Sequence, residues 1–338
     1  MKKISIIIPV YNAMTSGGGY ITRAVDSVLN QKNFPIEDVE MLLINDGSKD
    51  NSLGVLQKIA QKNPSVIRLI DQENIGVANT RNKAMKFATA EYTTFLDQDD
   101  WLDEDFFATL YKKAHDTNAD VVASGFRRPD KYGNIVRRFH LSNERYSRYT
   151  LSAAWAKLHK TEFLRKNSIK FFDNRYGEDL PFSVSENVLA LRYETDDYIG
   201  YNWFENKKSV SNTEQKQLTS DGIKSIERLL KRLCDMKPEV GQRDFYYYLL
   251  RTTVFYVLFS SRAITRMSFL NANQRFFAIL EKKDDVFSRR NIHKLLIPPK
   301  GEMKSVGFIV AVFILIEKLR LLPVLSVFWC KKPKTTEK

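Results

Sequence analysis

Three aspartates form an acidic cluster directly after a short apolar run. The segment FLDQDDW places Asp97, Asp99 and Asp100 within residues 95–101. Carboxylates this close repel one another unless a cation lies among them, and hard oxygen ligands select Mg²⁺ or Mn²⁺. The acidic cluster therefore predicts a divalent metal site. The alternative is that these acids only stabilise the N-terminus of the helix that follows.

A second acidic pair, Glu178 and Asp179, lies in the segment YGEDLPFS. Pro181 and the polar residues before it predict that the pair stands at the start of a helix, where carboxylates are favoured. Such a carboxylate can take a proton from a hydroxyl group within about 3 Å, and the neighbouring acid is expected to raise its pKa. From the residues alone, two adjacent acids on a solvated helix are the simpler explanation of the pair.

The first 126 residues alternate strand-like and helical patterns, which predicts an α/β fold with a mostly parallel sheet flanked by helices. Polar residues follow three of the strands: Tyr11 and Asn12, then Asp46, then the acidic cluster. Ligands of open parallel sheets bind beyond the carboxyl ends of strands, so one shared pocket is expected there. The expected strands are Ile4–Val10, Val39–Asn45, Val66–Asp71, Tyr92–Leu96 and Val121–Gly125, and the expected helices are Tyr20–Gln31, Asn51–Gln61, Val77–Ala88 and Glu104–Asp116.

Beyond Arg127 the pattern is less regular. The segment 127–138 is typical of a turn between two short strands, Thr150–Lys166 has helical spacing, and the chain is mostly helical from Ile223. We therefore expect two domains, residues 1–215 and residues 216–338. The glycine motifs of dinucleotide folds and P-loops are absent from the sequence.

Four segments carry a resemblance to a known family: ISIIIPVYNA (4–13), LLINDGSKDNS (42–52), ENIGVANTRNKAM (73–85) and FLDQDDW (95–101). In order and spacing they resemble the family 2 glycosyltransferases, clearly over residues 1–126 and more loosely to about 215. The resemblance implies the GT-A fold, a Rossmann-like nucleotide-sugar-binding architecture. It also implies transfer of a sugar from a nucleotide diphosphate donor with inversion at the anomeric carbon, usually with Mn²⁺ or Mg²⁺.

The resemblance assigns roles to individual residues. It implies a metal held by Asp99 and Asp97, with Asp100 either helping through water or serving only as a cap. An aromatic ring can stack on a base, a carboxylate can accept from an imide N–H, and a metal can neutralise a departing diphosphate. The residues implied to hold the nucleotide sugar are Pro9, Tyr11, Asn12, Asp46, Asn74, Arg81, Asp97, Lys208 and Ser209.

The resemblance also implies a catalytic base and an acceptor wall. Asp179 would be the base, and Glu178 would orient it or the acceptor. Trp155 and Lys157 match a Trp-x-Lys element that would contact the acceptor sugar, although a core tryptophan beside a snorkelling lysine is equally compatible with the segment. The segment MTSGGG before Tyr20 departs from the family pattern. It could cover the donor, widen the acceptor cleft or be a tolerated surface insertion.

Positive charge is concentrated in the C-terminal third of the 338 residues. The net charge is +13, but residues 1–130 hold 15 Lys and Arg against 18 Asp and Glu, whereas residues 201–338 hold 26 against 13. This basic region includes the apolar runs 245–259 and 305–316. The combination favours an anionic membrane surface over nucleic acid, and a core helix pair with a solvated basic face is the alternative.

The chain start, MKKISIIIPVYN, has too short an apolar run for a signal peptide, and no run reaches the eighteen or so apolar residues of a spanning helix. The two cysteines are too few for a disulfide framework. We therefore expect a cytoplasmic enzyme, peripheral at the inner face of the membrane. The resemblance, together with the basic C-terminal third, further implies that it uses a UDP-sugar to extend a polyprenyl-diphosphate-linked glycan of a cell-surface polysaccharide. The alternatives are transfer to a soluble or polymeric acceptor, such as teichoic acid or protein, and a non-catalytic basic binding protein.

Overall fold

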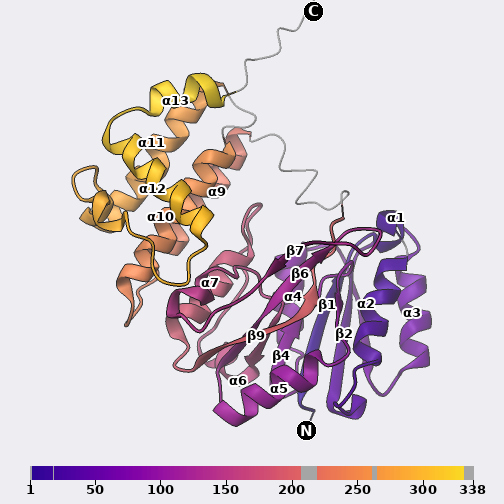
Figure 1. Ribbon diagram of the computed structural model, residues 1–338. Coiled ribbons are helices and arrows are strands. Elements are labelled where there is room, and N and C mark those ends of the chain that lie inside the picture. The colour runs from indigo at the N-terminus through magenta and orange to yellow at the C-terminus, as the bar shows by residue number, and fades with distance from the viewer. Residues whose placement is uncertain (1, 18, 207–218, 261–264, 331–338) are drawn as a thin grey trace, which may run out of the picture. The chain divides into compact units, whose positions relative to one another are not determined.

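The computed structural model describes residues 2–17, 19–206, 219–260 and 265–330 (Figure 1). Within this part of the chain the residues form two compact units. The first unit is built from residues up to 206, except for Arg145–Tyr149 and Asn174–Gly177, which belong to the second unit. The remainder of the second unit begins at residue 219.

One mixed sheet forms the centre of the first unit. Its strand order is β3-β2-β1-β4-β8-β6-β9-β5, with β7 paired to β6. The four strands β3-β2-β1-β4 are mutually parallel, as the sequence predicts, and β6 and β9 are parallel too. The strands are β1 (Ile4–Val10), β2 (Val39–Asp46), β3 (Ile67–Gln72), β4 (Tyr92–Phe95), β5 (Trp101–Leu102), β6 (Val121–Pro129), β7 (Ile135–Phe139), β8 (Lys157–Lys160) and β9 (Tyr193–Asn202).

The central strands are buried on both faces. In β1 every residue but Pro9 is buried, and β2 is buried along nearly its whole length, which explains their continuous apolar sequences. The parallel register pairs Val10 with Asn45 and Ile7 with Phe95. The carboxyl ends of β1, β2 and β4 therefore lie at one edge of the sheet, and the polar residues after them are brought together.

Four expected helices of the first unit are confirmed with small shifts of their ends. They are α2 (Gly19–Leu29), α3 (Ser52–Lys62), α4 (Val77–Met85) and α5 (Phe106–Thr117). A short helix, α1 (Ala13–Gly17), forms within the MTSGGG segment. Helix α4 packs on β1 and β2, and α5 packs on β6, β8 and β9. These contacts fix the start of α4 near the ends of β1 and β2.

The predicted helix over Thr150–Lys166 is wrong in its first part. Residues 157–160 form β8, and only Thr161–Lys166 are helical, as α6. Strand β8 lies antiparallel between β4 and β6. Its side chains Lys157, Leu158 and His159 are all buried, so tertiary pairing overrides the local helical spacing. This strand also interrupts the parallel order of the sheet, which the sequence predicted to be mostly parallel.

Two further expectations for the first unit are confirmed. The chain turns between β6 and β7 to form an antiparallel hairpin. A helix, α7 (Asp179–Leu189), begins at the acidic pair, with Glu178 as its N-cap residue. The next strand, β9, runs beside β6 and ends against β5, which directly follows the acidic cluster.

The second unit is helical, as expected from Ile223 onward. Helix α9 packs on α10 and α11, α11 packs on α13, and α10 packs on α12. Thr219 caps the N-terminus of α9 by accepting a hydrogen bond from the Gly222 amide at 3.2 Å. The long helices of this unit are α9 (Ser220–Cys234), α10 (Gln242–Ser260), α11 (Arg266–Lys283), α12 (Lys304–Lys318) and α13 (Leu322–Trp329). In the part of the chain that the structure describes, no helix has both the length and the apolar character to cross a bilayer.

Candidate functional site

Two hydrogen bonds join the loops that follow β1 and β2. The Asn12 amide donates to Ser48 Oγ at 3.0 Å, and Asn12 Oδ1 accepts from the Lys49 amide at 2.7 Å. Gly47 has a φ of +66°, and a Cβ there would lie 2.5 Å from the backbone nitrogen of Asn74. Only glycine fits this close approach without a shift. The predicted site residue Asn12 therefore holds the loop after β2, and Gly47 in that loop allows the backbone of Asn74 to approach the strand ends.

Asp46 holds the segment that leads into α4. Its carboxylate accepts from the Ile75 amide at 3.0 Å, the Gly76 amide at 3.1 Å and Gln72 Nε2 at 2.9 Å. Asn74 Nδ2 donates to the Asp46 carbonyl at 3.0 Å. Asp46 is buried by these bonds, which set where α4 begins. The predicted contact of Asp46 with a nucleotide base stays a prediction.

Tyr11 follows β1 and is 44% exposed, so its ring is available to a ligand. Its amide donates to Gln98 Oε1 at 2.9 Å, and its carbonyl accepts from Gln98 Nε2 at 3.1 Å. These paired bonds hold Tyr11 beside the acidic cluster, because Gln98 lies between Asp97 and Asp99. Pro9, in β1 itself, is partly buried. The structure therefore places Tyr11 and the acidic cluster side by side.

Arg81 of α4 joins both acidic groups that the sequence singles out. The side chain of Arg81 is only 5% exposed, and its Nη2 contacts Asp97 Oδ1 at 2.6 Å. Its Nη1 lies 3.0 Å from Asp179 Oδ1 and 3.9 Å from Glu178 Oε1. Residues far apart in the chain are thus held around one buried guanidinium. This bridge joins the carboxyl end of β4 to the start of α7.

A pair of hydrogen bonds ties α4 to the segment that leads into α7. Asn82 Nδ2 donates to the Phe171 carbonyl at 2.9 Å, and the Phe171 amide donates to Asn82 Oδ1 at 2.8 Å. Burial raises the pKa of Asp179 to about 7, against the attraction of Arg81, with Glu178 adding to the rise. A carboxyl group with this pKa exchanges protons near neutral pH, as a general base must.

The remaining acids of the cluster are tied to the end of β9. Asp99 Oδ2 accepts from Asn206 Nδ2 at 3.0 Å. The Asp100 carboxylate accepts from the Tyr201 hydroxyl at 2.7 Å and the Phe204 amide at 2.8 Å. The next helix, α5, has Asp105 at its N-cap, so the suggestion that Asp100 is a helix cap is wrong. The suggestion that the buried Asp100 acts through water stays a prediction. It anchors the chain after β9 to the acidic cluster.

A bound cation would relieve the repulsion among the carboxylates of the acidic cluster. Burial raises the pKa of Asp99, with a hydrogen bond from Asn206 opposing the rise and Asp97 adding to it. Burial, followed by Asp97 and Asp99, raises the pKa of Asp100 well above its usual range. In the described ranges, no group of three or more His, Cys, Asp or Glu side chains is arranged to hold a metal. Two carboxylates are nevertheless enough for a Mg²⁺ ion that also binds substrate phosphates.

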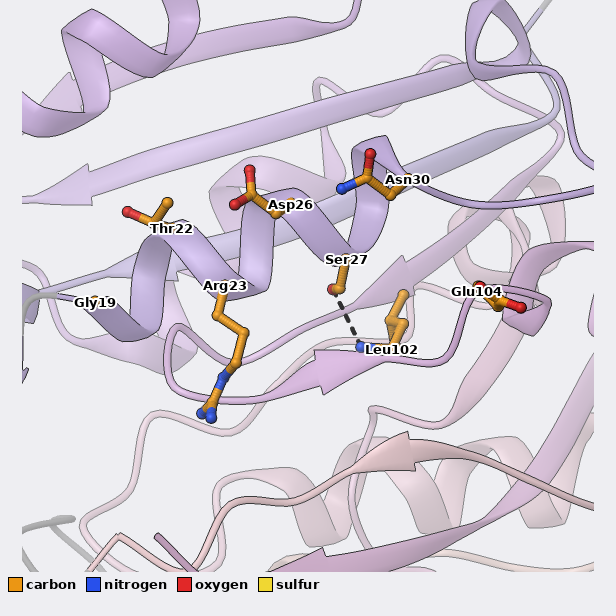
Figure 2. Close-up of a pocket in the computed structure, with 8 residues that line it drawn as sticks. All are labelled: Gly19, Thr22, Arg23, Asp26, Ser27, Asn30, Leu102 and Glu104. Atoms are coloured by element: carbon orange, nitrogen blue, oxygen red, sulfur yellow. Dashed lines mark hydrogen bonds between the residues drawn. The ribbon is translucent and has the colours of Figure 1, made fainter. Parts of the chain in front are cut away.

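Arg23 of α2 supports the cluster from the other side. Its Nη2 donates to the Asp99 carbonyl at 2.7 Å, and its guanidinium carbon lies 3.7 Å from the ring centre of Trp101 and 4.8 Å from that of Phe204. Arg23 also lines a pocket of about 480 Å³ along α2 and β5 (Figure 2). No residue that the sequence assigns to the site lines this pocket, which is made by Gly19, Thr22, Arg23, Asp26, Ser27, Asn30, Leu102 and Glu104.

The two residues predicted to contact the acceptor are core residues in this structure. Trp155 stacks on Tyr201, with ring centres 4.5 Å apart and planes 9° apart. The Lys157 side chain is 0% exposed and pairs with Glu186 Oε2 at 3.0 Å. A fully buried lysine has no surface to offer to an acceptor sugar, so the prediction for Lys157 is wrong here. The alternative of a core tryptophan fits Trp155.

Two other segments with predicted roles are described only in part or not at all. Lys208 and Ser209, expected near the diphosphate, lie outside the described residues. The MTSGGG segment is partly described: the Thr15 amide donates to Asp50 Oδ2 at 2.8 Å, and so does its hydroxyl at 3.0 Å. The segment is therefore attached to the start of α3, through Asp50, rather than to the acidic cluster.

The sequence matches a family model over residues 5–176, which is just over half of the chain. That model describes glycosyl transferase family 2. The chain belongs to this family. In this family 2 glycosyltransferase the matched region includes the acidic cluster and ends just before Glu178 and the start of α7 at Asp179.

Curated relatives share a modest level of identity with this glycosyltransferase. It is 27% identical to glycosyltransferase GlyA of Streptococcus pneumoniae over 56% of this chain and 29% of that protein. It is 28% identical to glycosyltransferase EpsJ of Bacillus subtilis over 63% of this chain and 64% of that protein. The match thus spans less than two thirds of either relative. A poly(ribitol-phosphate) β-N-acetylglucosaminyltransferase, TarP of Staphylococcus aureus, is 29% identical over 62% of this chain and 66% of TarP.

A solved structure has the same fold over nearly the whole chain. Residues 1–349 of S. aureus TarS, solved in complex with UDP-GlcNAc, align with a TM-score of 0.67. The alignment covers 96% of this chain and 90% of that one, at 18% identity. The GT-A fold expected from the sequence motifs is thereby confirmed, including the helical C-terminal part.

Several residues that build the site carry no signal in the sequence. In the sequence, Gln98 is a polar residue between two aspartates, and Arg23 is one charged residue of an expected amphipathic helix. Neither position indicates a contact with the site. Glu186 reads as a solvated acid, although it is fully buried.

Proposed function

We propose that this glycosyltransferase moves a sugar from a nucleotide diphosphate donor to a hydroxyl group of a glycan, with inversion and with Asp179 as the general base. The observation that carries the proposal is the Arg81 bridge. It holds Asp97, at the strand ends where donors bind in open α/β sheets, within two hydrogen bonds of Asp179. A single buried cation thus couples the donor side of the site to the proposed base.

The chemistry follows from this arrangement. The acceptor oxygen attacks the anomeric carbon and forms the new C–O bond, while the bond from that carbon to the diphosphate oxygen breaks. The acceptor proton passes to the Asp179 carboxylate, and the electron pair of the broken bond leaves with the nucleoside diphosphate. Glu178 lies on the same guanidinium and orients Asp179 or the acceptor. Direct displacement with one base inverts the configuration of the sugar.

Residues around the strand ends would bind the donor. We assign the nucleoside to Pro9, Tyr11 and Asp46, with Tyr11 stacking on the base. Asp97 and Asp99 would hold Mn²⁺ or Mg²⁺, because the charge of Asp97 raises the pKa of Asp99 and a cation would relieve that repulsion. When bound, such an ion neutralises charge on the leaving diphosphate. The nucleotide we propose is UDP, a choice supported by the fold shared with TarS, which was solved with UDP-GlcNAc.

We further propose that the second unit binds an anionic membrane surface, where a polyprenyl-diphosphate-linked acceptor would lie. The support is an apolar stripe on the outer sides of α12 and α13, with Phe308 70% exposed and Phe328 83% exposed. Exposed apolar patches on soluble proteins mark interaction sites when they are large. The stripe consists of Phe308, Ile309, Val312, Leu315, Leu319, Leu321, Val324, Val327 and Phe328.

Charge around the apolar stripe complements an anionic surface. Lys304, Lys318 and Arg320 are exposed along the same two helices. Glu317 is the one acid in residues 304–330, and its carboxylate faces inward to accept from Asn273 Nδ2 at 2.6 Å. Apolar side chains flanked by Lys and Arg suit the interface of an anionic bilayer, where each cation contributes about 1 kcal/mol. This surface would place the enzyme at the inner face of the cell membrane.

A second acceptor class is supported by the relatives. TarP acts on poly(ribitol-phosphate), as its name states, and the TarS fold covers nearly all of this chain. The basic second unit would suit an anionic phosphate polymer as well as a bilayer. Full activity on a free polymeric acceptor without membranes would favour that alternative. A polyprenyl-linked acceptor that works only on vesicles would favour the first.

The test is a donor screen with purified protein. UDP-, GDP-, dTDP- and CMP-sugars are each supplied with and without Mn²⁺, and both slow hydrolysis and thermal stabilisation are scored. A donor at a hundredfold excess over its Kd should stabilise the fold by about 2.7 kcal/mol. A UDP-sugar that stabilises the protein and is hydrolysed only with metal is the expected result. If no donor binds or is hydrolysed, the proposed activity is wrong.

A further inference from the structure

Three ionisable side chains are buried together beneath α7, away from solvent. Lys157, His159 and Glu186 each have a side-chain exposure of 0%. Lys157 Nζ lies 3.0 Å from Glu186 Oε2, and His159 Nδ1 contacts Glu186 Oε1. We call these three residues the buried network. Nothing in the site assignment above uses them, and burying charged groups is costly unless they are paired.

Each member of the buried network is held in place by the surrounding chain. Lys157 Nζ also lies 3.3 Å from Ser183 Oγ, which donates to the Ser152 carbonyl at 2.7 Å. His159 Nε2 lies 3.0 Å from the Ala154 carbonyl. Burial alone would raise the pKa of Glu186, but His159 and Lys157 lower it overall. The carboxylate of Glu186 is therefore held in its charged form by the two basic residues of β8.

Helix geometry connects the buried network to the proposed base. Asp179, Ser183 and Glu186 stand at positions i, i+4 and i+7 of α7, so they lie along one face of the helix. Lys157 contacts the second and third of these residues. Arg81 contacts the first. One face of α7 is thus lined by cations along its length, and a rotation of the helix would break all of these contacts together.

We propose that Lys157 is a positioning residue for Asp179. Its contacts with Ser183 and Glu186 fix the rotation of α7 about its axis, and its buried positive charge lies near the carboxylate of Asp179. This inference rests on the proposed role of Asp179. It replaces the acceptor contact expected of Lys157 from the sequence.

The charges that act on Asp179 come from four elements. They are Arg81 from α4, Asp97 from the end of β4, Glu178 at the start of α7 and Lys157 from β8. Lys157 and Arg81 both favour the ionised form of Asp179, whereas Glu178 and Asp97 oppose it. Removing the Lys157 charge should therefore make Asp179 harder to ionise. A residue that served only to fill the core would not move the ionisation of Asp179 in a defined direction.

The test compares Lys157→Met with Lys160→Met, a matched control at the other end of β8. Lys160 Nζ donates to Asn118 Oδ1 at 2.7 Å, and Lys160 is not part of the buried network. Transfer is measured against pH. For Lys157→Met we expect the midpoint to rise by about half a pH unit. Below the midpoint, turnover should fall about threefold with the KM for donor unchanged. Lys160→Met should leave the midpoint and the KM unchanged.

A second readout does not depend on activity. In protein carrying ¹³C in its aspartate side-chain carboxyl groups, the Asp179 resonance is the one absent from Asp179→Asn. Its titration should move upward in Lys157→Met and stay in place in Lys160→Met. A folded Lys157→Met protein with an unmoved Asp179 titration would overturn the inference. Absence of turnover in the unaltered protein with every donor would instead count against the proposed function.

Lys157→Met could fail to fold because it leaves Glu186 without a cation. The double variant Lys157→Met, Glu186→Gln removes both members of the pair, a change that buried ion pairs commonly tolerate. Its Asp179 titration is expected to move in the same direction by a smaller amount. An unmoved titration in the folded double variant would also overturn the inference.

Discussion

The two units place their charged and apolar side chains in opposite ways. The first unit buries charge: Arg81, Asp100, Lys157 and Glu186 are all at most 4% exposed. The second unit exposes apolar surface, with large side chains of α12 and α13 facing outward. Both patterns run against the usual distribution of residues between core and surface. Each pattern therefore indicates that a function, and not stability alone, determines the residue types at these positions.

The difference between the units indicates two kinds of work. Buried, paired charges hold carboxylates in fixed positions and keep water away, which is what a site for proton transfer needs. Exposed apolar side chains gain nothing until a partner covers them. The comparison therefore supports the proposals that the first unit carries the chemistry and that the second unit binds a surface. Three variants and one pH series can break or sharpen this division.

The largest expected effect is on stability, from Arg81→Met. Removing the guanidinium leaves Asp97 and Asp179 without their shared cation in a buried site. The free energy of unfolding should fall by about 3–5 kcal/mol, measured by chemical denaturation. Arg68→Met, at an exposed arginine of β3, is the control and should change stability by less than about 0.5 kcal/mol. Equal effects of the two substitutions would mean that the Arg81 bridge does not hold the site together.

A smaller effect is expected from the apolar stripe. In the double variant Phe308→Ser, Phe328→Ser, binding to vesicles of phosphatidylglycerol and phosphatidylethanolamine should weaken by about tenfold or more, because each phenylalanine contributes about 1.5 kcal/mol or more when buried. The control is Leu191→Ser, at a leucine of the first unit that is 92% exposed. The control should bind vesicles like the unaltered protein.

Sedimentation with vesicles measures this binding, and the same samples are examined for self-association. Unchanged vesicle binding in the double phenylalanine variant would contradict the membrane proposal. A protein that self-associates without vesicles, and loses that association in the variant, would show that a second copy covers the stripe instead.

The smallest effect is the pH dependence of the unaltered enzyme. Burial raises the pKa of Asp179 to about 7, and a base acts only when it is ionised. Transfer at saturating donor should therefore rise about tenfold per pH unit below that value and level off above it. A transfer rate that stays constant from about pH 5 to about pH 8 would contradict the role of Asp179 as a base near neutral pH.

Much of the donor half could be predicted from the sequence because its signals are local. The strands β1 and β2 are continuous apolar runs, and the polar residues that follow them are adjacent in sequence. Parallel register then brings these ends to one edge without further information. The start of α7 at Glu178 and Asp179 was also predictable, since Pro181 and the acids are local signals.

The buried pairings could not be predicted because they join distant residues. Arg81 and Asp179 are 98 positions apart, and Lys157 and Glu186 are 29 apart. Nothing in the segment TLSAAWAKLHK distinguishes a helix from a buried strand, because strand pairing with β4 and β6 decides the outcome. Lys157 was therefore placed at an acceptor wall, whereas the structure places it in the core.

The central claim is that Asp179 performs the chemistry of a site whose donor-binding part is separate from it. The most direct measurement compares Asp179→Asn with Asp173→Asn, an exposed carboxylate six positions earlier, for both donor binding and transfer rate. We predict that Asp179→Asn lowers the transfer rate by about 10²- to 10⁴-fold with donor binding retained, and that Asp173→Asn changes neither. Transfer by Asp179→Asn at the rate of the unaltered enzyme would contradict the account.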